Sequence, residues 1–296
     1  DRSSMATKLL VSGASGHLGR LVVGHLLDTL KIAPDRIYAT SRTPETLADF
    51  AARGVEVCAA DFDKPETLAD AFAGADRLLL ISTVSTDRTP QHRAAIDGAV
   101  KAGVKHVVYT SVPSATDPSL AIVKDHAATE KALAESALPG WTVLRNNWYF
   151  ENLDWTIPDL LKSGRWVTAN GDGRMAYISR DDLALAAATT LANGADKKQI
   201  YTLGGNKAYT TVELADLIGS TFGKTISVVN VPADEIEKGM IAHGVPEHLA
   251  KITASSQVLT ARGGLADVTG DFKKLTGREP KPLEAWLEEN KARFNA

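Results

Sequence analysis

Two kinds of segment, which differ in the spacing of their apolar residues, alternate along the first half of the chain. Short apolar runs are each followed by a longer segment whose apolar residues recur every three or four positions, which predicts a strand and then an amphipathic helix. The run 78–81 is continuously apolar, as expected for a central parallel strand covered on both faces. The alternation predicts an α/β fold with a Rossmann-like, doubly wound parallel sheet. We expect strands at 8–12, 36–40, 55–59, 77–82, 107–110 and 141–145, with helices including 44–54, 90–103 and 120–138 between them.

The pattern changes after Arg145. The segment 146–177 is rich in Trp, Tyr, Asn and Gly, and an alanine-rich helix at 180–192 is expected to return to the sheet. Beyond Gly204, amphipathic stretches such as 210–221 and 283–294 are separated by polar breaks. Open α/β sheets bind ligands at their carboxyl edge. We therefore predict a Rossmann domain at 5–150, to which 180–203 returns, and a small discontinuous C-terminal α/β lobe at 151–179 and 204–296 that binds substrate.

Three glycines stand between the first predicted strand and the helix that follows it. Gly13, Gly16 and Gly19 form the pattern G-x-x-G-x-x-G. In such a turn the first glycine permits the tight bend, the second lets a pyrophosphate approach the backbone, and the third lets the helix pack closely on the sheet. The helix N-terminus then offers free N–H groups and a partial positive charge to the phosphates. We expect a dinucleotide to be bound here by Gly13, Ala14, Ser15, Gly16, His17 and Leu18.

The end of the second predicted strand indicates which dinucleotide is bound. An acid near this point hydrogen-bonds the ribose 2′-hydroxyl in NAD-specific folds, whereas a basic residue accommodates the 2′-phosphate of NADP. No acid occurs between Tyr38 and Thr43, and Arg42 offers a planar set of donors that suits a phosphate. A solvated surface arginine is the alternative interpretation. We predict NADP(H) as the cofactor, with Arg42 as one of its ligands, so the Rossmann domain at 5–150 is expected to be the NADP-binding domain.

Composition narrows the classes of function. The 296-residue chain has a formal net charge of −3 and no basic run, which argues against nucleic acid as a partner. It has neither the roughly 18 consecutive apolar residues of a membrane span nor a signal peptide. Cys58 is the only cysteine and is interpreted as a core residue, so a reducing compartment, the cytoplasm, is expected. No metal-ligand spacing is present, so no metal site is expected. Residues 1–4, before Met5, are interpreted as a remnant of expression.

Several stretches together resemble one family: the glycine turn, Arg42, 78–82, 90–93, 102–105, 109–111, His126 with 129–131, and 144–149. The chain is similar to the NmrA-like branch of atypical short-chain dehydrogenases/reductases, and within it to quinone and triphenylmethane dye reductases. The resemblance implies an NADPH-dependent reductase of quinones or conjugated dyes, although the family also includes non-catalytic sensors of the NADP redox state.

The chain departs from ordinary dehydrogenases of the superfamily, which use a Ser and a Tyr-x-x-x-Lys pair. Val112, Ile122 and His126 stand at those three positions. A tyrosine–lysine pair protonates an alkoxide as hydride reaches an unactivated carbonyl. A quinone needs less help, because the hydride density delocalises into an aromatic anion that water can protonate. The missing triad therefore fits quinone or dye reduction, and it fits a sensor equally well.

The resemblance places further cofactor contacts where strands end. Asp61 and Phe62 are expected near the adenine, although Asp61 is also a candidate cap for a helix that begins near Pro65. Ile81, Ser82 and Thr83 are expected along the ribose. Contacts at the nicotinamide end are expected from Thr110, Ser111, Val112, His126, Asn146, Trp148, Tyr149 and Phe150. The alternative for the aromatic residues among them is that their rings cover the core.

The candidate catalytic residues are His126, Asn146 and Tyr149. His126 is expected either to hydrogen-bond the nicotinamide ribose or to supply a proton to the reduced quinone. The alternative is a structural histidine paired with Glu130, one helical turn further on. We predict direct hydride transfer from the nicotinamide to a small aromatic or quinone-like acceptor; the alternative is an NADP/NADPH-sensing regulatory protein. The chain is compatible with a homodimer.

Overall fold

The computed structural model describes residues 7–295, so Met5 and the segment 1–4 lie outside the described residues. The chain divides into two compact units. The first consists of the chain up to Ser111 together with His126–Arg145 and Leu183–Tyr201; the second consists of Val112–Asp125, Asn146–Asp182 and the chain from Thr202 onward. The assignment of a cofactor region and a substrate region within these units stays a prediction.

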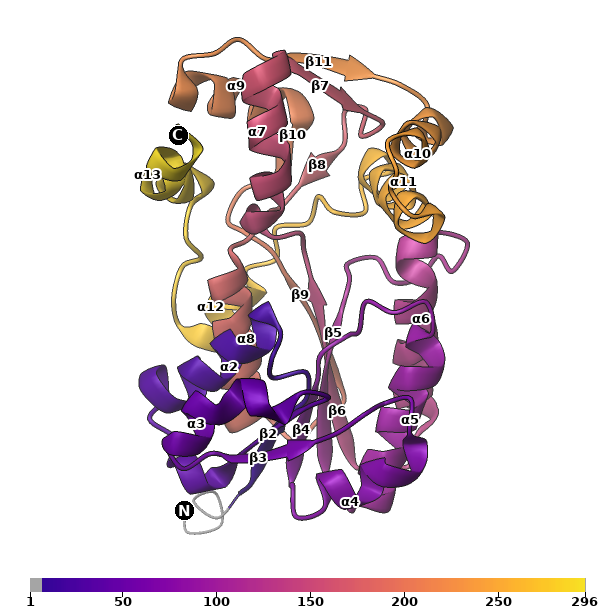
Figure 1. The fold of residues 1–296 in the computed structure, drawn as a ribbon, viewed down its shortest axis with the longest axis vertical. Helices are drawn as coiled ribbons and strands as arrows, with labels where there is room; N and C mark the ends of the chain where they lie inside the picture. The colour runs from indigo at the N-terminus through magenta and orange to yellow at the C-terminus, as the bar shows by residue number, and fades with distance from the viewer. Residues whose placement is uncertain (1–6, 296) are drawn as a thin grey trace. The chain divides into compact units, whose positions relative to one another are not determined.

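The first unit is built on a parallel sheet with the strand order β3-β2-β1-β4-β5-β6-β9 (Figure 1). The chain moves outward from β1 to β3, then crosses back to place β4 on the other side of β1. This reversal is the switch point of a doubly wound sheet, and it confirms the predicted fold class. The strands are β1 Leu9–Val11, β2 Ile37–Ser41, β3 Glu56–Ala59, β4 Arg77–Leu80, β5 His106–Ser111, β6 Gly140–Asn146 and β9 Gln199–Leu203.

Helices cover both faces of this sheet. Figure 1 shows α2, α3 and α8 on one side and α4, α5 and α6 on the other. Alternate strand residues such as Leu78, Leu80 and Tyr109 point to the second face, where they form one core with Phe72 and Ile96. The helices are α2 His17–Gly24, α3 Ala48–Ala52, α4 Leu68–Phe72, α5 Arg88–Lys101, α6 Ala121–Glu135 and α8 Arg180–Asn193.

Strand β3 shows where the sequence interpretation was wrong. It is the edge strand of the sheet, and none of its four residues is fully buried. Cys58 is therefore half-buried and not the core residue that the alternation indicated. The predicted helix 44–54 is likewise shorter, because Pro44–Leu47 forms a 3₁₀ turn before α3 begins.

The second unit contains two small sheets and six helices within the described residues. β8 Arg174–Met175 pairs antiparallel with β10 Tyr209–Thr210, and β7 Arg165–Thr168 pairs parallel with β11 Ser227–Asn230. The predicted helices near 210–221 and 283–294 are present, the first capped by the Thr210 hydroxyl, which accepts the Glu213 N–H. The helices are α7 Leu153–Ser163, α9 Thr211–Phe222, α10 Ala233–Ala242, α11 Glu247–Ala261, α12 Asp271–Thr276 and α13 Leu283–Phe294. Across residues 7–295, no helix has the length and apolar character needed to cross a membrane.

Candidate functional site

The structure requires glycine at two of the three glycine positions of the first turn. Gly13 has φ +61°, a left-handed conformation that side chains disfavour. A Cβ at Gly19 would lie 2.2 Å from the Gly13 carbonyl oxygen, so only glycine lets α2 pack this closely. Gly16 has an ordinary extended backbone, and a Cβ there would meet the Gly13 oxygen at a normal 3.5 Å. Within the described chain, neither backbone conformation nor packing requires residue 16 to be glycine, and the space beside it is open.

The turn is joined to the end of β2 by side-chain hydrogen bonds. The Ser15 and Ser41 hydroxyls are 2.7 Å apart, and Ser41 Oγ also accepts the Thr43 N–H at 3.0 Å. Between them, Arg42 is exposed, and its guanidinium has no partner among the contacts of the described chain. This arrangement holds the Arg42 backbone beside the turn and leaves its five donors available to an anion. His17, at the first position of α2, is exposed.

The segment after β4 is held in place by side chains from three other elements. The Ile81 N–H donates to Ser12 Oγ at 3.4 Å, and the Ser82 N–H donates to Thr110 Oγ1 at 2.8 Å. The Thr83 N–H donates to His92 Nε2 at 3.0 Å. Three successive N–H groups that have left the sheet ladder are thus satisfied one by one, which fixes the conformation of this segment.

Asp61 and Phe62 follow β3, and both are partly buried. Asp61 Oδ1 accepts the N–H of Asp63 at 2.9 Å, which is an Asx turn. The residue at the cap position of the 3₁₀ turn that begins at Pro65 is Lys64, so the alternative role of Asp61 as that cap is wrong. Because the strands are parallel, the segments after β1, β2, β3 and β4 and the end of β5 reach the same edge of the sheet.

His126 lies inside the first unit, with 4% of its surface exposed and both ring nitrogens engaged. Arg88 donates to Nε2 at 2.7 Å, so Nε2 is the acceptor and Nδ1 carries the proton that is shared with the Tyr109 hydroxyl at 2.6 Å. Burial, together with the positive charge of Arg88, holds the pKa of His126 well below its usual value. The imidazole is therefore neutral and oriented by protein groups on both sides.

The pairing of His126 with Glu130, the structural alternative from the sequence, is wrong. Glu130 instead accepts from Arg145 at 2.7 and 3.2 Å and from the Ser111 hydroxyl at 2.6 Å. The bidentate pair with Arg145 is largely buried and reaches across from β6, so it outcompetes a neighbour on the same helix. Ser111 and Thr110 are both buried at the end of β5.

The segment that follows β6 belongs to the second unit. The side chain of Asn147 has a structural role. Its N–H donates to the Leu265 oxygen at 3.0 Å, and its Oδ1 accepts the Trp148 N–H at 2.8 Å. Asn146 is 7% exposed, and its Oδ1 is buried with no hydrogen-bond partner. A buried acceptor left unsatisfied costs about 1–3 kcal/mol, so this oxygen is suited to a ligand donor.

The aromatic residues of this segment differ in burial. Phe150 is 1% exposed and packs on Trp286, with ring centroids 5.9 Å apart, so its ring belongs to the core of the second unit. Trp148 and Tyr149 are partly exposed. Desolvation raises the pKa of Tyr149, so its hydroxyl remains protonated. Of the predicted contacts, Val112 also lies in this unit and is 7% exposed.

Comparison with known proteins identifies the family. A sequence model described as NAD(P)H-binding matches residues 13–194. Quinone oxidoreductase 2 of Escherichia coli is 35% identical over 276 residues, which cover 93% of this chain and 96% of that protein. An NmrA-like family domain-containing oxidoreductase of Aspergillus flavus is 31% identical over 296 residues, covering 93% of this chain and 92% of that protein. The chain belongs to the NmrA-like oxidoreductases of the NAD(P)H-binding family.

Solved structures of NmrA-like relatives share the whole fold. The NADPH-dependent quinone oxidoreductase of Escherichia coli in complex with NADPH aligns with a TM-score of 0.89 at 35% identity, over 95% of this chain and 98% of that one. The triphenylmethane reductase of a Citrobacter species, complexed with NADP(H), aligns with a TM-score of 0.84 at 34% identity, over 95% of this chain and 99% of that one. The predicted family, the oxidoreductase class and the NAD(P)H cofactor are confirmed.

Sequence reasoning missed three residues of this NmrA-like protein. Arg88 orients His126, and His92 holds the segment after β4. Arg180, described below, lies over Tyr149. The stretch 90–93 carried the resemblance, yet nothing in its spacing indicated that His92 would accept a backbone N–H. The only feature of the sequence that could have drawn attention to Arg180 was its place at the start of a predicted helix.

Proposed function

We propose that this chain is an NADPH-dependent reductase that transfers hydride directly to a quinone or a similar conjugated acceptor. The part of the proposal that concerns the cofactor rests on Gly16. This residue lies at the N-terminus of α2, where neither the backbone conformation nor the packing of the chain requires a glycine. Support for the acceptor comes from the relatives named as quinone and triphenylmethane reductases, and from Val112, Ile122 and His126 at the positions of the usual catalytic triad.

The residues of the chain act by binding and orientation in this proposal. The glycine turn and the first N–H groups of α2 hold the phosphates, Arg42 contacts the 2′-phosphate, and the segment 81–83 lines the ribose. The buried Asn146 Oδ1 accepts a hydrogen bond from the carboxamide end of the cofactor. The bound nicotinamide supplies the hydride. Alignment of the reacting rings and exclusion of water account for the rate, and the proton that completes the hydroquinone comes from water.

His126 is a positioning residue in this proposal, and its replacement tests that. His126→Ala deletes one hydrogen bond from each of Arg88 and Tyr109 and leaves a cavity, so we expect the free energy of unfolding to fall by about 2–4 kcal/mol. Turnover of a saturating quinone should fall by less than about 10²-fold, the lower limit for loss of a true general acid. Thermal unfolding and kcat are measured on the same preparation. A larger loss of kcat in a variant that is still folded would make His126 the acid.

Replacement of Arg42 tests the cofactor preference. Wild-type protein should bind NADPH more tightly than NADH, and Arg42→Ala should lose about tenfold in NADPH affinity while NADH affinity is unchanged, because an exposed charge-assisted contact is lost. Fluorescence titration of both reduced cofactors measures this. Arg36→Ala is a control arginine, since Arg36 Nε donates to the Thr7 carbonyl instead. Equal affinities of the wild type for NADPH and NADH would contradict the assignment.

Multiple turnover distinguishes the enzyme from the sensor. Catalytic amounts of protein mixed with NADPH and a panel of benzoquinones, naphthoquinones and triphenylmethane dyes should consume many equivalents of NADPH. If none of the panel is reduced while NADP and NADPH bind with clearly different affinities, the redox-sensing alternative holds. The cytoplasm, where NADPH is kept reduced, is the compartment that we propose, and a homodimer remains a prediction that size-exclusion chromatography with light scattering can test.

A further inference from the structure

Arg180 places a positive charge over the ring of Tyr149 and near the carboxylate of Glu151. Its guanidinium lies 5.1 Å from the centre of the Tyr149 ring. The geometry is fixed by the backbone, because Tyr149 forms a parallel bridge with Ile178, two residues before Arg180. Among the described residues, the guanidinium makes no ion pair and no hydrogen bond. The side chain is partly exposed, so a charged partner can reach it.

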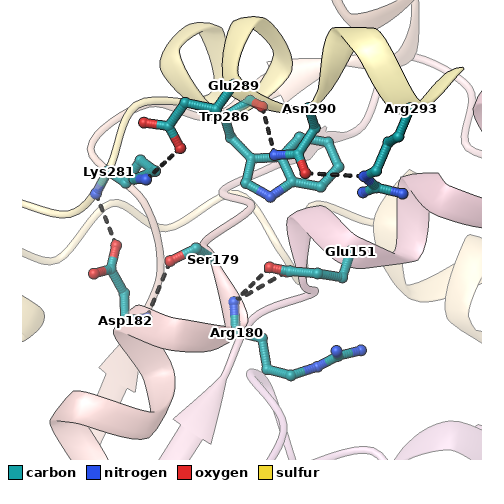
Figure 2. A network of polar contacts seen from close by, with 9 residues as sticks. All are labelled: Glu151, Ser179, Arg180, Asp182, Lys281, Trp286, Glu289, Asn290 and Arg293. Carbon is teal, nitrogen blue, oxygen red and sulfur yellow. Dashed lines mark hydrogen bonds and ion pairs between the residues drawn. The ribbon is translucent and has the colours of Figure 1, made fainter. Parts of the chain in front are cut away.

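The carboxylate beside Arg180 is occupied by the backbone instead. Both oxygens of Glu151 accept the Arg180 N–H, at 3.0 and 3.2 Å. Figure 2 shows the Arg180 side chain pointing away from that carboxylate. The Ser179 hydroxyl accepts the Asp182 N–H at 3.0 Å and completes the cap of α8. The start of the helix is therefore satisfied without the guanidinium.

Another stacked arginine in the same unit shows the usual arrangement. Arg293 lies 5.6 Å from the centre of the Trp286 ring, but it also donates to Asp154 at 2.5 Å and to Asn290 at 2.9 Å. The ion pair with Asp154 neutralises the charge of Arg293 on the surface. The charge of Arg180 favours the ionised form of nearby Glu151 and so acts to lower its pKa, but the guanidinium forms no ion pair with a described residue. The donors of the Arg180 guanidinium are therefore available to a group that is not part of the chain.

The chemistry of the proposed acceptor supplies such a group. A quinone that gains a hydride carries one negative charge on its oxygens and ring until it takes a proton from water. A guanidinium stacked on an aromatic ring offers a planar set of donors to an oxyanion. The aromatic ring beside it offers an apolar contact to the ring of the acceptor that carries this oxyanion. We propose that Arg180 is an acceptor-binding residue that pairs with the anionic oxygen of an aromatic acceptor. This inference rests on the proposed function, and it extends it to a preference for acceptors that carry or develop negative charge.

A matched pair of naphthoquinones tests the inference. 2-Hydroxy-1,4-naphthoquinone is an anion at neutral pH, and its 2-methoxy analogue is neutral and similar in size. Binding of each is measured by quenching of tryptophan fluorescence without cofactor, and kcat and KM are measured with NADPH. Arg180→Gln should weaken binding of the anionic quinone about tenfold and of the neutral one less than about threefold. Arg180→Lys should restore part of the loss, and the KM for NADPH should stay unchanged.

Arg293→Gln is the control, and it should leave both quinones unaffected. Equal weakening of the two quinones by Arg180→Gln, no weakening of either, or a matching rise in the KM for NADPH would each overturn the inference. If the wild-type protein reduces no quinone of the panel, the proposed function fails instead. Binding of the anionic quinone without cofactor still tests Arg180 in that case.

Discussion

Gly16→Val is expected to lower NADPH affinity by at least about 10²-fold while leaving the fold intact. The valine side chain would occupy the space through which the pyrophosphate approaches the N-terminus of α2. Loss of two charge-assisted hydrogen bonds, at about 1.5–3 kcal/mol each, gives this magnitude. The variant should fold, because the backbone of Gly16 is extended and a Cβ there meets only the Gly13 oxygen at 3.5 Å. Fluorescence titration measures affinity and circular dichroism measures folding.

The neighbouring glycine provides the matched control for this prediction. Gly19→Ala places a methyl group 2.2 Å from the Gly13 oxygen and 2.8 Å from Ala14 Cα, so it should lower thermal stability even in the absence of cofactor. The two variants therefore separate a ligand effect from a packing effect. Unchanged NADPH affinity in a folded Gly16→Val protein would mean that the turn does not hold the phosphates.

Tyr149→Ala is expected to lower kcat for quinones by about 10²-fold. If the ring helps to position the acceptor, its loss displaces the reacting rings, and a misplacement of about 1 Å can cost this much. The variant also removes the surface on which Arg180 stacks. Steady-state kinetics with saturating NADPH and quinone measure the effect.

The hydroxyl of Tyr149 is tested separately from its ring. Tyr149→Phe should stay within a few-fold of wild type, because the burial-raised pKa keeps the hydroxyl protonated and the proposal assigns it no proton transfer. If Tyr149→Phe is as slow as Tyr149→Ala, the hydroxyl is the proton donor and orientation alone does not explain the rate.

Local patterns predicted the fold well, whereas long-range contacts decided the details of the site. The glycine turn was recognisable because Gly13, Gly16 and Gly19 act within one strand–turn–helix. The expected pairing of His126 with Glu130 followed a helical rule, but Arg145 from β6 competes for that carboxylate.

The contact between Tyr149 and Arg180 was beyond sequence reasoning for a similar reason. It depends on the bridge between Tyr149 and Ile178, which joins segments about 30 residues apart in the chain. The prediction that Cys58 is a core residue was wrong because alternation along a strand does not reveal that the strand lies at the edge of its sheet.

Direct hydride transfer from the nicotinamide is tested most directly by the fate of deuterium at its C4. Protein is mixed with a quinone and with NADPH that carries deuterium on one face or the other of C4, and the NADP⁺ formed is analysed by mass spectrometry. Transfer within an ordered site predicts that NADP⁺ loses the label completely from one stereoisomer and keeps it completely from the other. A mixture of labelled and unlabelled NADP⁺ from both stereoisomers, or no oxidation of NADPH at all, would contradict the account.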